Sequence, residues 1–121
     1  MKLSEAIRLG AMLRPQGFGP QVVTERGSCV WGAAIEAIGQ YPNVYWSRVL
    51  SKWPVATEPS VCPVLRCGTL GSVSGVMVHL NNDHCWTREK IAEWVATMEP
   101  NAQDPVAPPV ERATLEGALR D

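Results

Sequence analysis

The chain has 121 residues, which is the size of one ordinary domain and enough to bury a hydrophobic core. Its 11 basic and 12 acidic residues nearly cancel, and neither sign forms a long block. That balance argues against the basic surface of a nucleic-acid-binding protein and against a polybasic segment that binds anionic membranes.

The first residues, MKLSEAIRLGAML, place a Glu and an Arg inside the stretch that would have to be apolar in a secretory signal peptide. No run of about 18 apolar residues occurs anywhere in the sequence. We therefore expect a cytoplasmic protein with no membrane partner. In a reducing compartment, four cysteines favour metal ligands, catalytic thiols or buried side chains over a disulfide framework.

Apolar residues recur at helical spacing in five segments, and a Ser, Thr or Asn precedes most of them as a candidate N-cap. The predicted helices cover residues 4–13, 29–39, 44–53, 72–84 and 88–98. Their predicted N-caps are Ser4, Ser28, Asn43 and Thr87. A short strand is expected at residues 22–24. The second helix is almost wholly apolar, so it is expected to be the central buried helix, ended by Gly39.

The apolar stripes of the other helices predict the rest of the core. In the first helix the stripe consists of Leu3, Ile7, Ala11 and Met12. In the third and last helices it consists of Trp46, Leu50, Trp53, Ile91, Trp94, Val95 and Met98. Aromatic residues at this spacing are typical of a core rather than of a ligand-stacking surface.

The composition changes after residue 99, where EPNAQDPVAPP contains four prolines and few large apolar groups. Such a segment cannot bury enough surface to offset the entropy lost on ordering, so we interpret it as a linker. Val110, Leu115 and Leu119 follow in a weak amphipathic pattern, which fits a helix docked on a partner or on its own domain, or a frayed end. The chain is therefore divided into a domain of residues 1–99 and a Pro-rich linker and tail of residues 100–121.

The side chains that can bind a metal gather in one region. They are Cys62, Cys67, His79 and His84, in the spacing C-x(4)-C-x(11)-H-x(4)-H. This spacing is one residue short of the two-cysteine, two-histidine zinc-finger pattern in its middle segment. A turn can bring two thiolates together while a helix presents two imidazoles one turn apart, and zinc accepts that tetrahedral mixture. Gly68 is the residue that a tight turn after the second cysteine requires.

The zinc-finger pattern is incomplete in two respects. Gly71 stands where a finger has an aromatic residue, and the predicted helix of residues 72–84 has no Arg or Lys with which to contact phosphate or guanine. We therefore expect no nucleic-acid partner. Cys85 could replace His84 as the fourth ligand, although neighbouring residues on a helix point about 100° apart. A structural metal site, unligated buried side chains and a disulfide are all open from the sequence.

Cys29 offers a second interpretation. It lies at the start of a predicted helix, where backbone N–H groups and the helix dipole favour the thiolate that a thiol hydrolase needs. The fragment GSCVWG resembles the sequence around the catalytic cysteine of papain-like enzymes, but its Trp is displaced by one position and the chain is too short for that fold. We therefore expect a protein that is not an enzyme and keep a Cys29-dependent thiol enzyme as an alternative.

The stretch HLNNDHCWTREKIAEWV resembles one found in small uncharacterised proteins of bacterial and prophage genomes, which pair it with an upstream cysteine knuckle. The segments KLSEAIRLGAMLRPQ and SCVWGAAIEAIG are also similar to those proteins, so the resemblance covers about residues 1–100. It implies a small α-rich protein, either cytosolic or phage-encoded, with a zinc knuckle, and it implies no reaction. The knuckle is widened here to CPVLRC, and Cys85 stands where a polar or basic residue is expected.

These observations predict a mainly α fold, namely a small helical domain with a short zinc-knuckle or β-hairpin element that is zinc-finger-like over residues 60–86. We expect a non-enzymatic interaction or adaptor protein that binds a protein partner. A structural zinc would be held by Cys62, Cys67, His79 and His84. One alternative is a phage structural or assembly component without metal. Another is a nucleic-acid-binding protein whose basic face would need Arg48, Lys52, Arg66, Arg88 and Lys90. The sequence does not indicate an oligomeric state.

Overall fold

Helices are the main secondary structure of the computed structural model, which describes residues 1–19, 22–24 and 26–99. The helices are α1 (Leu3–Ala11), α2 (Val30–Ala37), α3 (Trp46–Lys52), α4 (Val73–Asn82) and α5 (Arg88–Ala96), with a 3-10 turn η1 (Pro54–Thr57). Two small antiparallel hairpins join β1 (Val23–Thr24) to β2 (Gly27–Ser28) and β3 (Pro59–Val61) to β4 (Leu70–Ser72). The mainly α fold with a short β element is therefore confirmed, whereas the predicted tail lies outside the described residues. Among the described helices, none has the length and apolar character needed to cross a membrane.

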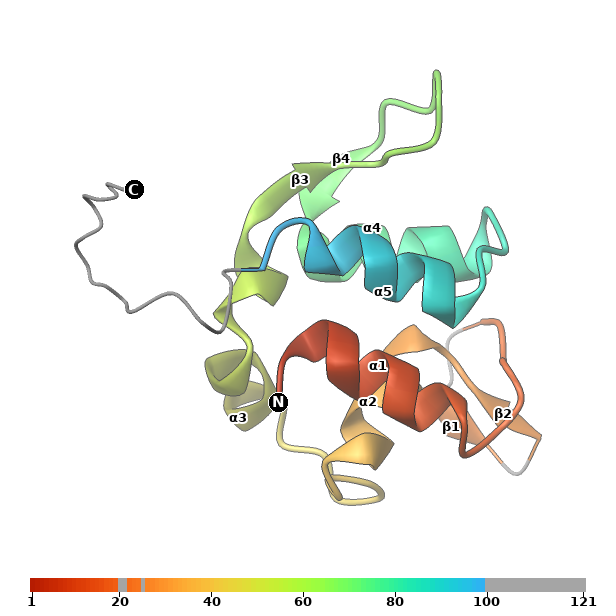
Figure 1. Cartoon of the computed structure of the whole chain (residues 1–121), viewed down its shortest axis with the longest axis vertical. Coiled ribbons are helices and arrows are strands. Elements are labelled where there is room, and N and C mark those ends of the chain that lie inside the picture. The colour runs from red at the N-terminus through yellow and green to blue at the C-terminus, as the bar shows by residue number, and fades with distance from the viewer. Residues whose placement is uncertain (20–21, 25, 100–121) are drawn as a thin grey trace.

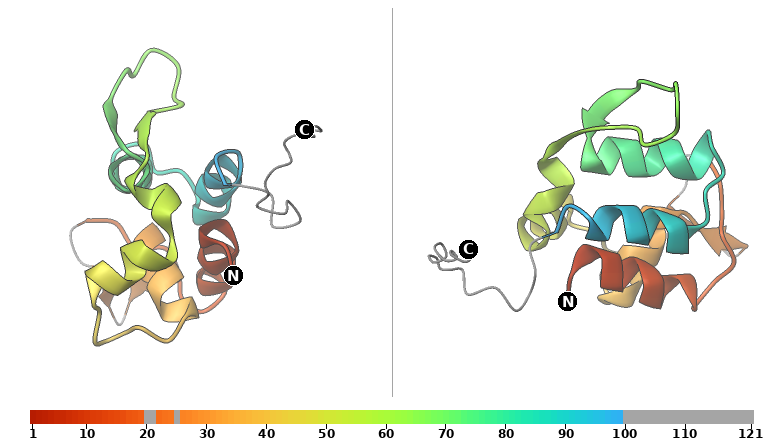
Figure 2. Two further views of the ribbon diagram at one scale, coloured as in Figure 1. Left: turned by 90° about the vertical axis from the view of Figure 1, so that its left-hand side faces the viewer. Right: turned by 45° about the horizontal axis from the view of Figure 1, so that its top comes forward.

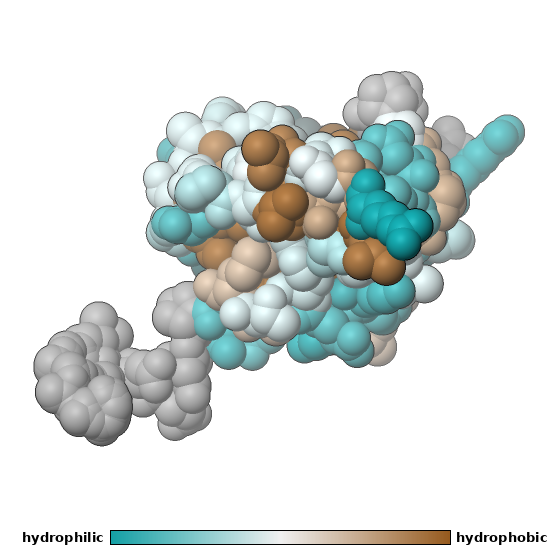
Figure 3. Space-filling model, turned by 90° about the horizontal axis from the view of Figure 1, so that it is seen from above, coloured by the Kyte–Doolittle hydropathy of each residue, from teal (hydrophilic) through white to brown (hydrophobic). Residues whose placement is uncertain are grey.

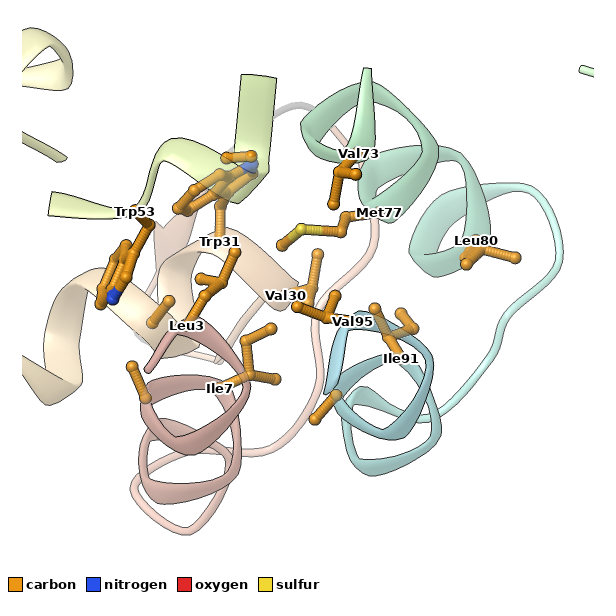
Figure 4. Close-up of a cluster of buried hydrophobic side chains, with 14 of the residues drawn as sticks. Leu3, Ile7, Val30, Trp31, Trp53, Val73, Met77, Leu80, Ile91 and Val95 are labelled. Carbon is orange, nitrogen blue, oxygen red and sulfur yellow. The ribbon is translucent and has the colours of Figure 1, made fainter. Parts of the chain in front are cut away.

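The helices pack around one core, and the β3–β4 hairpin projects from it (Figure 1). α1 lies against both α2 and α5, and α5 returns beside α4 after a short turn (Figures 1 and 2). Figure 4 shows large apolar side chains from these helices meeting in the centre. They include Leu3, Ile7, Val30, Trp31, Trp53, Val73, Met77, Leu80, Ile91 and Val95.

Two predicted core residues lie at the surface instead. Met12 is 81% exposed because α1 ends before it, and Trp46 is 41% exposed at the start of α3. Val49 takes the buried position on α3, with 1% of its surface exposed. The Trp46 ring still packs against Trp31 in a T-shaped arrangement, with ring centroids 5.5 Å apart. Trp53 is buried as predicted, with 3% of its surface exposed, so the predicted stripe of α3 differs from the structure mainly at Trp46.

α1 and α2 approach each other too closely for an ordinary side chain at one position. A Cβ added to Gly10 would lie 1.7 Å from the carbonyl oxygen of Ala33, so only glycine fits there without moving a helix. α2 then ends as predicted, because Gly39 adopts a φ of +72° just beyond the helix.

The N-terminus of α1 is bound by a residue from the far end of the domain. α1 begins one residue earlier than predicted, so Ser4 lies in its first turn rather than capping it. The carboxylate of Glu99 accepts hydrogen bonds from the Ser4 backbone N–H at 2.9 Å and from the Ser4 hydroxyl at 2.5 Å. A sequence-local rule could not find this cap, because the two residues are 95 positions apart.

Two further predicted caps are also wrong, and one is confirmed. Ser28 belongs to β2, and Cys29 caps α2 with its sulfur. Asn43 lies in the preceding loop, and Tyr45 stands at the cap position of α3 without a side-chain hydrogen bond. Thr87 caps α5 as predicted, since its hydroxyl accepts a hydrogen bond from a backbone N–H of the first turn.

Arg88 is buried, although it was counted above as a member of a basic face. Only 4% of its surface is exposed, and its guanidinium donates to the Ser28 hydroxyl at 2.8 Å and to the Arg14 carbonyl at 2.7 Å. A third bond reaches the carbonyl of Ala11 at the end of α1. Burial lowers the pKa of Arg88. The side chain therefore ties α5 to the segment after α1 and is not available to a nucleic acid.

Candidate metal centre

The loop between β3 and β4 contains a tight turn and carries both candidate cysteine ligands. The Cys62 N–H donates to the Thr69 carbonyl at 2.8 Å, and the Cys67 N–H donates to the Val64 carbonyl at 3.1 Å. Gly68 has a φ of +72°, the left-handed conformation that the sequence analysis expected at this turn. These backbone contacts turn both cysteine side chains towards α4, beside which the loop runs (Figure 2).

α4 brings its histidine to the same place because it continues directly from the hairpin. Ser72 is both the last residue of β4 and the N-cap of α4, where its hydroxyl accepts a hydrogen bond from the Gly75 N–H at 3.1 Å. No linker separates the two elements, so the register of the hairpin fixes the rotation of the helix. His79 is then placed on the side of α4 that faces Cys67.

His84 reaches the cluster in a way that the sequence did not predict. α4 ends at Asn82, so the two imidazoles do not share a helix face. Instead, the chain bends beyond the helix, and the His84 N–H donates to the His79 carbonyl at 3.3 Å. Cys85 follows with a φ of +53°, which turns the chain back towards α5. The helix end, rather than the helix face, therefore brings the second imidazole to the first.

The four predicted residues converge in the folded chain. The metal-binding atoms of Cys62, Cys67, His79 and His84 all lie within 4.8 Å of one another. The Cys67 sulfur is 3.3 Å from Nε2 of His79, and Nε2 of His84 is 3.1 Å from the same nitrogen. The two imidazole rings are not stacked, because their planes meet at an angle of 87°.

Two of these separations are close to those around a tetrahedral ion. With metal–sulfur bonds of about 2.3 Å and metal–nitrogen bonds of about 2.0 Å, neighbouring ligand atoms in a tetrahedron lie about 3.3 to 3.8 Å apart. The sulfur–nitrogen and nitrogen–nitrogen distances given above are within a few tenths of an ångström of that range. Two sulfurs and two nitrogens are also soft donors, which favour transition metals over magnesium or calcium. The group can therefore hold a metal ion.

The other cysteines are not part of this group. Cys85 is exposed and lies outside the cluster, so it does not take the place of His84. Cys29 is buried and accepts a hydrogen bond from the Gly32 N–H. All four cysteines are free, so the disulfide alternative is not found.

The pKa values of the two thiols in the cluster are shifted in opposite directions. Hydrogen bonds from Thr69 and His79 lower the pKa of Cys67 to about 5. Burial raises the pKa of Cys62. The pKa of His79 is raised by its hydrogen bond to Cys67 and then by its bond to Asp83. At neutral pH, Cys67 is therefore a thiolate, which is the form that binds metal, while Cys62 must lose its proton on binding.

Comparison with known proteins gave no match: no protein-family model, no curated protein and no solved structure resembles the chain at a significant level. The site must therefore be interpreted from its own geometry. The resemblance drawn from the sequence motifs stays a prediction.

Two residues around the cluster were missed or undervalued in the sequence. Thr69 contacts the Cys67 sulfur through its hydroxyl at 3.2 Å, and no pattern in the sequence singled it out. The sequence allows Asp83 either to orient one of the two histidines or to lie exposed at a helix end. In the structure, Asp83 accepts a hydrogen bond from Nδ1 of His79 at 2.8 Å while its side chain remains 67% exposed. The i, i+4 spacing of Asp83 and His79 is the signal that could have found this pair.

Proposed function

We propose that Cys62, Cys67, His79 and His84 hold one structural zinc ion in a non-enzymatic interaction or adaptor protein. The convergence of all four ligand atoms within 4.8 Å supports the proposal. In the bound state zinc would fasten the β3–β4 loop to the end of α4. Zinc suits the site because it accepts a tetrahedral mixture of sulfur and nitrogen and has no redox chemistry of its own.

A closed set of four protein ligands supports a structural role rather than a catalytic one. Catalytic zinc sites keep one position for water or substrate, whereas structural sites use four side chains. Asp83 would complete the arrangement, because a carboxylate on Nδ1 holds the proton there and leaves the Nε2 lone pair of His79 free for the metal.

Exposed apolar side chains on the β3–β4 hairpin, beside the proposed zinc site, support a protein partner. Leu65 is 85% exposed, Leu70 is 78% exposed, and Val61 is 49% exposed, all on β3, β4 or the loop between them. The view down onto the hairpin shows apolar residues gathered on this face beside hydrophilic ones (Figure 3). Large side chains of this kind on a small loop are typical of a surface that another protein covers. A phage-associated role rests on the motif resemblance alone.

The proposal is tested by the metal content of the purified chain. After dialysis against metal-free buffer, the wild-type protein should keep about one zinc per chain, and less than about 0.2 per chain would contradict the site. Cys67→Ser should lose the metal. Cys85→Ser is the matched control, because it removes an exposed cysteine that lies outside the cluster, and it should keep the metal.

The same geometry supports a second candidate function, that of a thiol enzyme, in the metal-free state. The Cys67 sulfur, His79 and Asp83 form a chain of hydrogen bonds of 3.3 and 2.8 Å, which is the order of groups in a thiol nucleophile with its base and orienting carboxylate. The structure thus favours Cys67 over Cys29 for thiol chemistry, since both histidines of the chain lie beside Cys67.

Alkylation rates separate the two functions. If Cys67 is a nucleophile, iodoacetamide should modify it much faster than Cys85 in the metal-free protein, and a substrate-like thioester should be cleaved. If the site is structural, one equivalent of zinc should abolish the fast labelling and no turnover should be seen at any metal concentration. Equal slow labelling of both thiols without zinc would remove the second candidate.

A further inference from the structure

The two cysteines of the cluster lie near enough to each other to react together. Cys62 and Cys67 belong to the loop between β3 and β4, both are free, and their sulfurs lie within 4.8 Å of each other. A disulfide bond places two sulfurs about 2 Å apart, so these sulfurs would have to approach by less than about 3 Å. A change of side-chain rotamer moves a sulfur by a distance of that order. The fold therefore brings the two thiols within reach of a covalent bond.

Most of the chain between the two cysteines lies at the surface. Pro63, Leu65 and Arg66 are exposed, and Leu65 is exposed to 85%. The base of the loop is held separately, because the Cys62 N–H donates to the Thr69 carbonyl at 2.8 Å. Exposed residues with few buried contacts change conformation at a low cost in free energy. The loop can therefore adjust as the sulfurs approach while the base of the hairpin keeps its hydrogen bond.

The two thiols differ in their access to an oxidant in the solvent. Cys62 is only 5% exposed and packs in the core, whereas Cys67 is half-buried. The Cys67 sulfur also lies 3.2 Å from the Thr69 hydroxyl and 3.3 Å from Nε2 of His79. Hydrogen-bond donors at these positions stabilise a thiolate, which is the form of cysteine that peroxides oxidise. Cys67 is therefore placed to react first, and the buried Cys62 is placed to react with the product.

We propose that Cys67 is an oxidation site for hydrogen peroxide and that Cys62 then closes a disulfide bond with it. In the first step the Cys67 thiolate attacks one peroxide oxygen and the O–O bond breaks. This gives a sulfenic acid, and the leaving hydroxide takes a proton from the solvent. In the second step the Cys62 sulfur attacks the Cys67 sulfur, the S–O bond breaks, and the released hydroxide takes the Cys62 proton. The sulfurs lose two electrons in total, and the peroxide is reduced to two molecules of water.

Release of zinc would follow, and this part of the inference rests on the proposed function. Zinc is bound by the thiolate form of cysteine, and a disulfide sulfur carries no such charge. Only His79 and His84 would then remain as ligands. The loss of two ligands out of four would free the β3–β4 loop from the end of α4, and a thiol reductant would restore the site. Peroxide would thus control whether the hairpin is fastened to the helix.

The test treats the full-length chain, with and without zinc, with one equivalent of hydrogen peroxide. Peptide mass mapping without reductant should find a disulfide bond between Cys62 and Cys67, and a chromophoric chelator should detect about one zinc released for each bond formed. Cys62→Ser should stop at a Cys67 sulfenic acid, which dimedone traps at least about tenfold faster than any product at Cys85. Cys85→Ser is the matched control and should form the disulfide at the wild-type rate.

Three outcomes would overturn the proposal. The first is the absence of a bond between Cys62 and Cys67 in the metal-free wild-type chain, which decides the matter even if Cys62→Ser does not fold. The second is a disulfide that joins Cys85 instead, and the third is equal dimedone labelling of Cys67 and Cys85. Zinc content is measured before peroxide is added. A chain that holds no zinc but forms the bond contradicts the zinc site alone, whereas a zinc-loaded chain that never forms it contradicts the oxidation alone.

Discussion

Replacing Asp83 tests whether a carboxylate outside the ligand set contributes to metal binding. Asp83→Ala removes the hydrogen bond to Nδ1 of His79, which is 2.8 Å long. Loss of such a partner weakens metal binding about 10- to 100-fold. The Asp83 side chain is 67% exposed, so water replaces part of the lost bond and we expect the lower end of that range. A tenfold change corresponds to about 1.4 kcal/mol of binding free energy.

The dissociation constant for zinc is measured at pH 7 by competition with a chromophoric chelator. Asp83→Asn should fall between wild type and Asp83→Ala, because the amide oxygen still accepts the Nδ1 proton but carries no charge. Glu93→Ala is the matched control, since it removes an exposed carboxylate from α5. The free energy of unfolding without metal should change by less than about 0.5 kcal/mol in all three variants. An unchanged zinc affinity for Asp83→Ala, or an equal loss for Glu93→Ala, would refute the reasoning.

Three further predictions follow from the packing and ionisation. Gly10→Ala should destabilise the fold by about 3 kcal/mol or more, because its Cβ would overlap a carbonyl of α2. Gly75→Ala should stabilise the fold by about 0.5 kcal/mol, because there is room for a Cβ at that helical position. Chemical denaturation measures both changes in the free energy of unfolding. Gly68→Ala should cost about 1 kcal/mol, since its φ is +72° but no atom lies in the way, and a neutral result in the same assay would contradict the assigned turn. Zinc affinity should fall roughly ten- to hundredfold for each pH unit below 7, because zinc must displace the protons that acid adds to the ligands. Burial raises the pKa of Cys62, and hydrogen bonding raises the pKa of His79. Calorimetry in buffers of different ionisation enthalpy should show the matching release of protons.

The fold class and the four clustered residues could be predicted because each has a local signal. Helical periodicity placed the five helices, and the spacing of Cys62, Cys67, His79 and His84 predicted that they meet. Gly68 and Gly39 were predicted from the same kind of local chemistry, since a left-handed residue is required at each turn.

The errors concern features that only tertiary structure decides. Ser4 was predicted as a cap from its neighbours, but the partner of that helix end is Glu99, at the other end of the domain. Arg88 has the composition of a surface residue, yet it is buried among backbone carbonyls that no sequence pattern reveals. His84 was placed on the helix by periodicity, whereas α4 ends before it and a bend presents the imidazole instead.

The hydrogen bonds between Glu99 and Ser4 also determine how the domain can be rearranged. They hold the two ends of residues 1–99 side by side, so a short connection could join them without disturbing a helix. New ends could then be opened in the exposed turn at Gly39, which lies outside every helix and strand. A circularly permuted chain of this design would keep the hairpin and α4 as one uninterrupted segment, and would thus carry its metal ligands unchanged into a different order of elements.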